Sequence, residues 1–316
     1  MNINTRKFSS VKAKRLAVRI ITPIVRWVFL ISISYVLLYP LIYMLSASFR
    51  SFADFTDPTV MWVPKNFTIE SFKAIWSVID YPKALLNTVI YEMISALIEV
   101  MTCAITAYGL ARFEFKGKNI LTFVLLLTIL IPTEMIIIPL MTSMKSVDVF
   151  GILNLIGKLM GTDIRPNLLN TPLAFYIPSL LSVGLKSGLF IYMYVQFFKG
   201  LPKELEEAAS IDGAGPIKTF LTIVVPSSGT IFLTVTIFSV IWHWNDQILA
   251  SMYLAKSHTL SVKLSLLTSL ILDRGNPDIA GRLMASCLLC ILPPLILYCI
   301  LQKQFIKSID RVGIVG

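Results

Sequence analysis

Charged residues and histidines are scarce in this sequence. Asp, Glu, Lys and Arg make up 15% of the 316 residues, whereas about a quarter of a soluble domain is charged. This shortage excludes an ordinary soluble globular protein. There are only two histidines, and no nucleophile, base and metal ligands converge in the sequence, so a membrane enzyme is also disfavoured.

Cysteine is rare as well, and all four cysteines fall in apolar segments: Cys103, Cys287, Cys290 and Cys299. A disulfide framework is therefore not expected. Cys287 and Cys290 form a C-x-x-C motif, but no histidine or lysine lies close to them. We interpret all four as small packing residues rather than redox or metal-binding groups, and we expect no metal and no cofactor.

Acidic residues are too few to balance the basic ones, 18 against 28, which leaves a net charge of +10. Such an excess can indicate nucleic-acid binding, yet no basic stripe is interleaved with aromatic residues. The basic residues instead cluster beside apolar segments, as the positive-inside rule describes for membrane proteins. We expect no nucleic-acid partner and a chain surrounded by membrane lipid.

Long apolar segments dominate the sequence. The chain is 56% apolar, with a mean hydropathy of +0.77, and six segments are long enough to cross a bilayer as helices. They lie at 27–47, 85–110, 121–141, 175–197, 231–253 and 283–301. Residues 1–26 carry basic residues and no acidic one, so we expect both termini in the cytoplasm. A cleavable signal peptide is disfavoured, because the first apolar run is too long and no small-x-small site follows it.

Three ionisable residues inside these spans are candidates for the transport path: Glu134, Lys186 and Asp246. Charges in lipid are expensive, so such residues usually face a bundle interior or a water-filled cavity. They either pair with one another or line a path across the membrane. Trp242, Trp244 and Asn245 lie just before Asp246, and indole rings beside amide and carboxylate groups suit the apolar faces and hydroxyl rims of sugars. The tryptophans could equally anchor the span at the membrane interface.

Residues 200–226, between the fourth and fifth spans, combine charge with helical apolar spacing. We expect a first helix that opens at Pro202 and ends near Gly213, because glycine readily adopts the left-handed closing conformation. A second helix should run from Pro216 to Pro226, with apolar residues at i, i+3, i+4 and i+7. Small residues on the exposed bend would let another protein approach closely: Ala208, Ala209 and Gly213.

Four stretches carry a resemblance to one family. The run EAASIDGAG at 207–215, closed by Pro226, resembles the coupling loop of binding-protein-dependent ABC importer permeases, and more narrowly of the maltose-type carbohydrate permeases. AYGLARFEFKG at 107–117, WND at 244–246 and the C-terminal run 302–316 are similar to motifs of the same family. The sequence departs from the family pattern after Pro226, where Ser228 begins a segment without the usual proline, and at Ser308 and Ile314.

The resemblance implies a fold, a location and partners. The implied fold is all-α, a polytopic type I ABC importer permease with six transmembrane helices and a cytoplasmic coupling helix, in a bacterial cell membrane. The implied partners are ATP-binding subunits, a second permease subunit and an extracellular or periplasmic solute-binding protein, and the implied substrate is a sugar or oligosaccharide. The residues that match the ATPase-coupling loop are Glu207, Ala208, Ala209, Asp212, Gly213 and Pro226.

This interpretation divides the chain into a cytoplasmic tail (1–26), a first transmembrane helix with its outer loop (27–84), a permease core (85–302) and a second cytoplasmic tail (303–316). The outer segment 144–172 contains GILNLIGKL, which superficially resembles a phosphate-binding P-loop. Five residues rather than four separate Gly151 from Gly157, and Leu159 stands where a Ser or Thr would hold magnesium. We therefore expect a non-catalytic subunit whose partner chain hydrolyses ATP.

An ion-coupled secondary transporter or channel is the alternative. That class often shows inverted repeats and helices broken in the middle of the membrane, and the sequence shows neither clearly. Co-purification with an ATPase and a requirement for ATP would separate the two functions.

Overall fold

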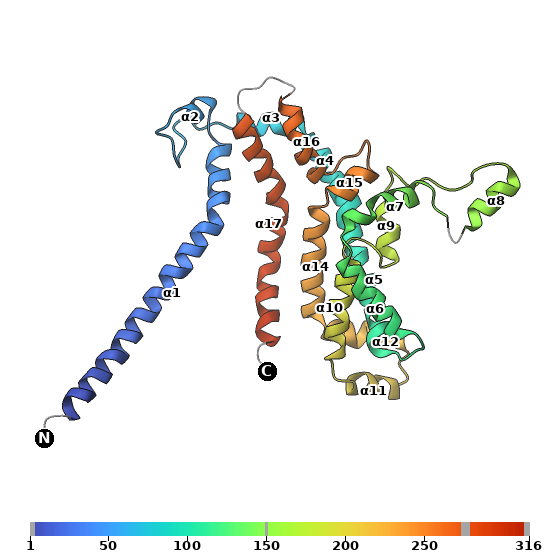
Figure 1. The fold of residues 1–316 in the computed structure, drawn as a ribbon, viewed down its shortest axis with the longest axis horizontal. Coiled ribbons are helices and arrows are strands. Elements are labelled where there is room, and N and C mark those ends of the chain that lie inside the picture. The colour runs from blue at the N-terminus through green and yellow to red at the C-terminus, as the bar shows by residue number, and fades with distance from the viewer. Residues whose placement is uncertain (1–3, 149–150, 273–278, 313–316) are drawn as a thin grey trace. The chain divides into compact units, whose positions relative to one another are not determined.

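The computed structural model describes residues 4–148, 151–272 and 279–312 (Figure 1). Within these ranges the regular structure is helical apart from a single antiparallel bridge between Arg50 and Phe67, so the predicted all-α class is confirmed. The chain divides into two compact units, Met1–Ala74 with Asn276–Leu288, and Ile75–Gly275 with Leu289–Gly316. The four-part division predicted from the sequence concerns membrane topology and stays a prediction.

The first unit is built on α1 (Asn4–Ser48), which contains the first predicted span. Its stretch Arg19–Ser48 is long and apolar enough to cross a membrane, and side chains 19–40 are all exposed. A helix with so much exposed apolar surface needs lipid or a partner protein around it. After α1 comes α2 (Phe52–Thr56). The buried Arg50 guanidinium donates to the Met61 carbonyl at 2.6 Å and holds the following segment back against the helix end.

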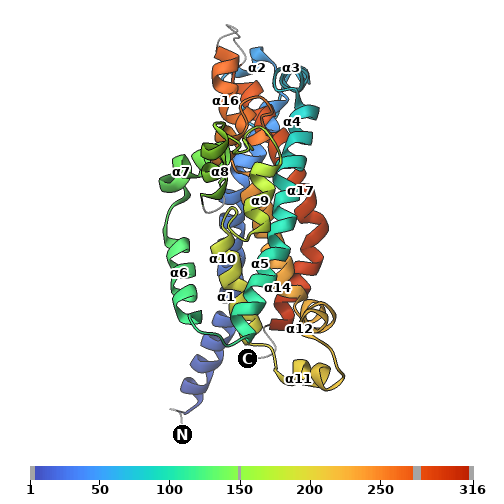
Figure 2. The same cartoon turned by 90° about the vertical axis from the view of Figure 1, so that its right-hand side faces the viewer.

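The second unit is organised around α5 (Ile94–Arg112). The helices α3 (Glu70–Val78), α4 (Tyr81–Asn87) and the π-helical turn η1 (Thr88–Met93) precede it. Together, Tyr81–Arg112 form a helix long and apolar enough to span a membrane, as predicted for the second span. In both views α5 lies beside α10 (Ser187–Lys199) and α14 (Gly229–Trp244) (Figures 1 and 2).

Small residues on α5 face large aromatic residues on α10. Ala104 and Ala107 are fully buried on α5, as are Phe190, Tyr194 and Phe198 on α10. The three aromatic residues recur every four positions and so share one face of their helix. The small side chains of α5 leave room for the aromatic rings of α10, so the two helices pack closely without voids. This contact forms the core of the second unit. Cys103 belongs to the same buried cluster, which confirms its prediction as a packing residue.

The third predicted span is bent and not a straight helix. It consists of α6 (Lys118–Leu130) and α7 (Thr133–Lys145), and the axes of Lys118–Leu130 and Met135–Lys145 differ by 108°. Ile131 adopts an extended conformation between them. Pro132 causes this, because a proline disfavours helical geometry in the residue before it.

The fourth predicted span is also interrupted, so the expectation of a continuous helix was wrong. α9 (Leu173–Leu180) and α10 are separated by residues 181–186, in which Ser182 and Lys186 have positive φ angles of 58° and 64°. A right-handed helix cannot continue through such residues. In the fifth span, α14 is followed after a short turn by α15 (Ile248–Tyr253).

The remaining helices outside the loop 200–226 are α8 (Ile152–Met160), α16 (Leu260–Leu272) and α17 (Ile279–Val312). α17 contains the last predicted span, and Pro293 and Pro294 lie inside it without ending it. Within the described residues, three helices could cross a membrane by length and composition, or five if each of two bent pairs counts as one span.

Candidate functional site

The segment 200–226 begins with the short helix α11 (Glu204–Ile211). It starts two residues after the predicted Pro202, because the first carbonyl that accepts a helical bond belongs to Lys203. At its other end Gly213 has φ +77°. The N–H of Gly213 donates to the Ser210 carbonyl at 3.0 Å and that of Ala214 to the Ala209 carbonyl at 2.9 Å. This pair of bonds is the Schellman motif, so the predicted closing glycine is confirmed.

A partly buried ion pair fixes α11 to the end of α5. Arg112 Nε lies 2.6 Å from Glu206 Oε1, with only 7% of the arginine side chain exposed. Tyr108 donates its hydroxyl to Glu206 Oε2 at 3.0 Å, and Arg112 Nη2 donates to the Leu201 carbonyl at 3.0 Å. These bonds hold the loop in one position relative to the core helix.

The second helix of the loop continues beyond its predicted end. α12 (Pro216–Thr219), the π-helical turn η2 (Phe220–Val224) and α13 (Val225–Ser227) follow one another without a break. Pro216 opens α12 as predicted, and the helix ends at Ser227, one residue after the predicted end at Pro226. The chain then bends by 83° between Pro216–Ser227 and Gly229–Trp244.

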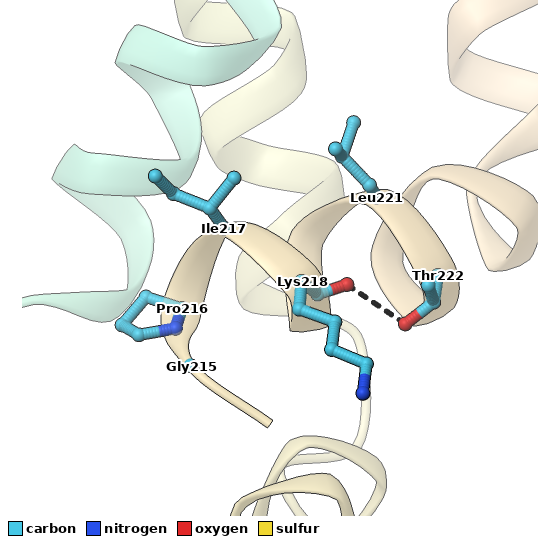
Figure 3. A pocket seen from close by; sticks show the side chains of 6 residues that line it. All are labelled: Gly215, Pro216, Ile217, Lys218, Leu221 and Thr222. Atoms are coloured by element: carbon cyan, nitrogen blue, oxygen red, sulfur yellow. Dashed lines mark hydrogen bonds between the residues drawn. The ribbon is translucent and has the colours of Figure 1, made fainter. Parts of the chain in front are cut away.

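One face of this second helix is buried and the other is open. Phe220 and Val224 belong to the core between α5 and α10, whereas Ile217 is 78% exposed and Leu221 is also exposed. Figure 3 shows these two side chains beside a surface hollow of about 530 Å³ that Pro216, Lys218 and Thr222 also line. The Thr222 hydroxyl donates to the Lys218 carbonyl at 2.7 Å.

The predicted loop residues differ in exposure. Glu207, Ala208, Asp212, Gly213 and Pro226 are exposed, but Ala209 is buried, so its predicted place on the exposed bend was wrong. The helix turns Ala209 inward together with the anchored Glu206. The surface is more apolar than expected, because Ile211 is 86% exposed and Leu205 is exposed as well.

A cavity of about 670 Å³ lies within the second unit. Its wall comes from η1, α5, α6, α7, α9, α10, α14 and α15 and from the break before α10. Three of the predicted path residues line it: Lys186, Trp242 and Asp246. Asp246 Oδ1 also accepts the N–H of Leu249 at 3.1 Å and so caps the start of α15. In the described part of the chain, no ion pair joins Lys186 to Asp246.

The other predicted path residues lie elsewhere. Trp244 is buried, and its indole N–H donates to the Cys290 carbonyl at 3.1 Å. Asn245 is exposed, and its amide donates to the Ile241 carbonyl at 2.8 Å. Neither is among the residues that line the cavity. Glu134 belongs to α7, and its side chain lies outside the described part of the structure.

A cluster of three buried ionisable residues was missed by the sequence analysis. His243 Nδ1 lies 3.0 Å from Glu92 Oε2, and His243 Nε2 lies 2.7 Å from Glu99 Oε2. Glu92 and Glu99 are spaced by two helical turns and therefore share one face of the second span. That spacing within an apolar segment was the available signal. Both ring nitrogens are engaged, and among residues 4–148, 151–272 and 279–312 no His, Cys, Asp and Glu group is arranged to hold a metal.

The same cluster is bonded to the helix break. The Ser187 hydroxyl donates to Glu99 Oε1, and Thr102 Oγ1 donates to the Ser179 carbonyl at 2.6 Å. Gly184 packs so closely here that a Cβ atom would lie 3.0 Å from Glu99 Oε1. Polar groups of α5 therefore satisfy the backbone and side chains where the fourth span is interrupted, as irregular backbone at membrane depth requires.

Comparison with known proteins gives a family match and similar chains. Residues 100–311 match the model of the family described as "Binding-protein-dependent transport system inner membrane component". The chain is 29% identical over 279 residues to the diacetylchitobiose uptake system permease protein NgcG of Streptomyces coelicolor, covering 88% of this chain and 84% of that protein. It is 30% identical over 280 residues to the melibiose/raffinose/stachyose import permease protein MelC of Bacillus subtilis, covering 88% and 91%.

Among solved structures, the chain is similar to a crystal structure of a bacterial ABC transporter involved in the import of the acidic polysaccharide alginate. The TM-score is 0.67 at 19% sequence identity, covering 92% of this chain and 98% of that chain. At this identity the likeness concerns the fold.

Proposed function

Because this chain belongs to the family of binding-protein-dependent transport system inner membrane components, we propose that it passes a sugar or oligosaccharide through the membrane while a partner subunit hydrolyses ATP. The chain is a multi-pass permease subunit of such an importer. The names of NgcG and MelC refer to oligosaccharides, and they support this substrate class.

The observation that carries the proposal is the anchored loop 200–226. Its helix α11 is bonded to α5 through the Arg112–Glu206 ion pair, while the side chains of Ile211 and Ile217 are exposed. An exposed apolar surface on a rigidly held helix is suited to docking into another protein. ATP-driven closure of a partner would move such a helix, and with it α5, as one body.

We infer the partners from the family and from this arrangement. We place the loop and both termini in the cytoplasm, with ATP-binding subunits docked on α11 and α12. The matched loop residues on this surface are Glu207, Ala208, Asp212 and Gly213. A second permease would complete the transport path, and an extracellular or periplasmic solute-binding protein would deliver the sugar to it. The cavity that Lys186, Trp242 and Asp246 line is the part of the path contributed by this chain.

The test replaces an exposed isoleucine of the loop and measures coupling. Ile217→Asp should lower both ATPase co-purification and ATP-driven sugar uptake about 10-fold or more, since a charge would be buried at the docking surface. Val63→Asp is the matched control, because Val63 is 77% exposed against 78% for Ile217 and lies in the predicted outer loop. Equal effects of the two substitutions, or normal uptake by Ile217→Asp, would rule out this docking surface.

The interrupted fourth span gives some support to the alternative, an ion-coupled secondary transporter or channel, since such proteins often have broken helices. Purified complexes in liposomes separate the two. The proposed function requires uptake to stop without ATP and to persist when ionophores dissipate all ion gradients. The reverse pattern would establish the alternative.

A further inference from the structure

We propose that Glu92 presents a fixed hydrogen-bond acceptor to the transported sugar, at the point where the Glu92–His243–Glu99 cluster meets the cavity of the second unit. The inference rests on the proposed function, because it concerns a solute inside that cavity. It assigns a substrate-recognition role to a residue that the family resemblance does not mark.

Glu92 has one carboxylate oxygen engaged and one without a partner. Oε2 lies 3.0 Å from His243 Nδ1, whereas Oε1 is buried and has no hydrogen-bond partner in the described structure. The residue is 1% exposed, yet it is part of the cavity wall together with His243 and Asp246. Buried polar atoms are nearly always hydrogen-bonded, so an orphan oxygen beside a cavity indicates a missing donor.

The rest of the cluster holds this carboxylate in place. His243 is bonded on its far side to Glu99 Oε2 at 2.7 Å, and Glu99 Oε1 accepts the hydroxyl of Ser187. The Glu92 side chain is therefore oriented by groups from α5, α10 and α14. A binding group that is fixed before the ligand arrives loses little conformational entropy when it binds.

The surrounding charges favour a neutral, hydroxyl-rich ligand. Acidic and basic groups both line the cavity, Asp246 among the first and Lys186 among the second, so neither an anion nor a cation is favoured. Trp242 and Tyr253 are also part of the wall and offer aromatic surface to the apolar face of a sugar ring. The volume of about 670 Å³ is within the usual range for small-molecule sites.

The experiment uses the complete importer, purified with its partner subunits and reconstituted in liposomes. Diacetylchitobiose, raffinose and melibiose are offered first, and the sugar transported fastest becomes the probe. Its single-deoxy derivatives are then compared with the parent sugar. The wild-type importer should take up one derivative roughly 10-fold more slowly in kcat/KM, as expected for the loss of one hydrogen bond.

Glu92→Gln should weaken this discrimination, because its amide can keep a carbonyl oxygen on His243 only by turning an NH₂ group toward the cavity. That group donates where the carboxylate accepts, so the hydrogen of the sugar hydroxyl is left without its acceptor. The parent sugar should lose more of its uptake rate than the sensitive derivative does. Glu99→Gln is the matched control: it disturbs the same cluster, but Glu99 is not among the cavity-lining residues, so the discrimination between the two sugars should persist.

The outcomes are distinguishable. No ATP-dependent uptake of any offered sugar by the wild-type importer would argue against the proposed function itself. ATP-driven uptake in which no single hydroxyl matters, or in which Glu92→Gln keeps the wild-type discrimination, would overturn this inference and leave the proposed function standing. If Glu92→Gln fails to assemble, Glu92→Asp replaces it: it keeps the carboxylate but withdraws it by one methylene group, so the discrimination between the two sugars should weaken, and unchanged discrimination would overturn the inference.

Discussion

Arg112 is the residue through which the loop 200–226 is held on the core, because it bonds both Glu206 and the Leu201 carbonyl. Arg112→Ala leaves the carboxylate partly buried without its partner, which costs about 3 kcal/mol for a buried pair. We expect the number of sugar molecules transported per ATP hydrolysed to fall several-fold. Parallel measurement of uptake and phosphate release in liposomes checks this.

The neighbouring residues give a graded comparison. Tyr108→Phe removes only one neutral donor to Glu206 and should lower the same ratio less, in line with about 1 kcal/mol for a single hydrogen bond. Glu204→Gln alters an exposed carboxylate on the same helix and should leave the ratio unchanged. The anchoring role is wrong if Glu204→Gln uncouples transport as strongly as Arg112→Ala.

Asp246 has two separable roles, one in the cavity and one as a cap. Asp246→Asn keeps an oxygen that can accept the N–H of Leu249 but removes the charge from the cavity wall. Uptake should fall while the importer still assembles. Asp246→Ala also loses the cap, worth about 1 kcal/mol, so its melting temperature should be lower than that of Asp246→Asn. Uptake assays and thermal melting of the purified importer together separate the two effects.

Asn245→Ala is the comparison for the cavity role, since Asn245 bonds the Ile241 carbonyl on the exposed side of the helix end. Its uptake should stay close to wild type. A loss of uptake in Asn245→Ala equal to that in Asp246→Asn would contradict the assignment of the cavity as the path.

At the scale of the elements, the contact between α6 and α10 depends on Gly188. A Cβ atom at this position would overlap the Thr128 hydroxyl oxygen, while Thr128 Cβ would remain 3.5 Å away. Gly188→Ala should therefore destabilise the protein by about 1–3 kcal/mol, as overpacking does. Adding Thr128→Ala removes the overlapping atom and should restore most of the stability. Thermal unfolding in detergent measures this coupling.

Gly109→Ala provides the control for that experiment, because a Cβ atom there has no neighbour within 4 Å. Alanine favours a helix interior more than glycine does, so stability should stay equal or rise. If Gly188→Ala is harmless, or if Thr128→Ala does not rescue it, the close packing of α6 on α10 is incorrect.

The helices and turns differ in how well they could be predicted from the sequence. The turn at Gly213 and the helix opening at Pro216 could be predicted because local chemistry decides them. The interruption at residues 181–186 could not be predicted, since the residues on either side of it are bonded to Thr102 and Glu99, which are distant in sequence. The π-helical turn Phe220–Val224 could not be predicted for a similar reason, because both of these residues pack on core residues that are distant in sequence.

The cavity was predicted only in part. An ionisable residue in an apolar run is a signal readable from the sequence. It singled out Lys186 and Asp246, which line the cavity, and their role in a transport path stays a prediction. Trp244 is buried against the Cys290 carbonyl and is not part of the cavity wall. This could not be predicted, because a tryptophan's position along a helix does not reveal which of its sides faces the cavity. His243 lies between the two tryptophans but was not predicted as a site residue. A single histidine in an apolar segment does not indicate a buried cluster, and its contacts with Glu92 and Glu99 appear only in the folded structure.

At the scale of the whole molecule, the prediction is that the loop 200–226 faces the cytoplasm. Ser210 and Val63 are both exposed, and a cysteine at either position should react with a maleimide that reaches it. In intact cells, Ser210→Cys should react only with a membrane-permeant maleimide, whereas Val63→Cys should react with an impermeant one as well.

Maleimide labelling of the unaltered chain measures the background from the native cysteines, of which Cys299 is exposed. Labelling of Ser210→Cys from outside would place the loop on the wrong side for an ATPase. That result would remove the coupling assignment and leave the family membership untouched.

The interruption of the fourth span has a consequence for how the protein enters its membrane. α9 has 8 residues and α10 has 13, so at 1.5 Å per residue they reach about 12 and 20 Å of a hydrocarbon layer roughly 30 Å thick. Neither can settle in lipid alone during synthesis, because the Ser179 carbonyl and Ser182 hydroxyl depend on Thr102 and Thr106 of α5. The nascent chain must therefore retain α5 beside the insertion machinery until α10 has been made, and release the two together.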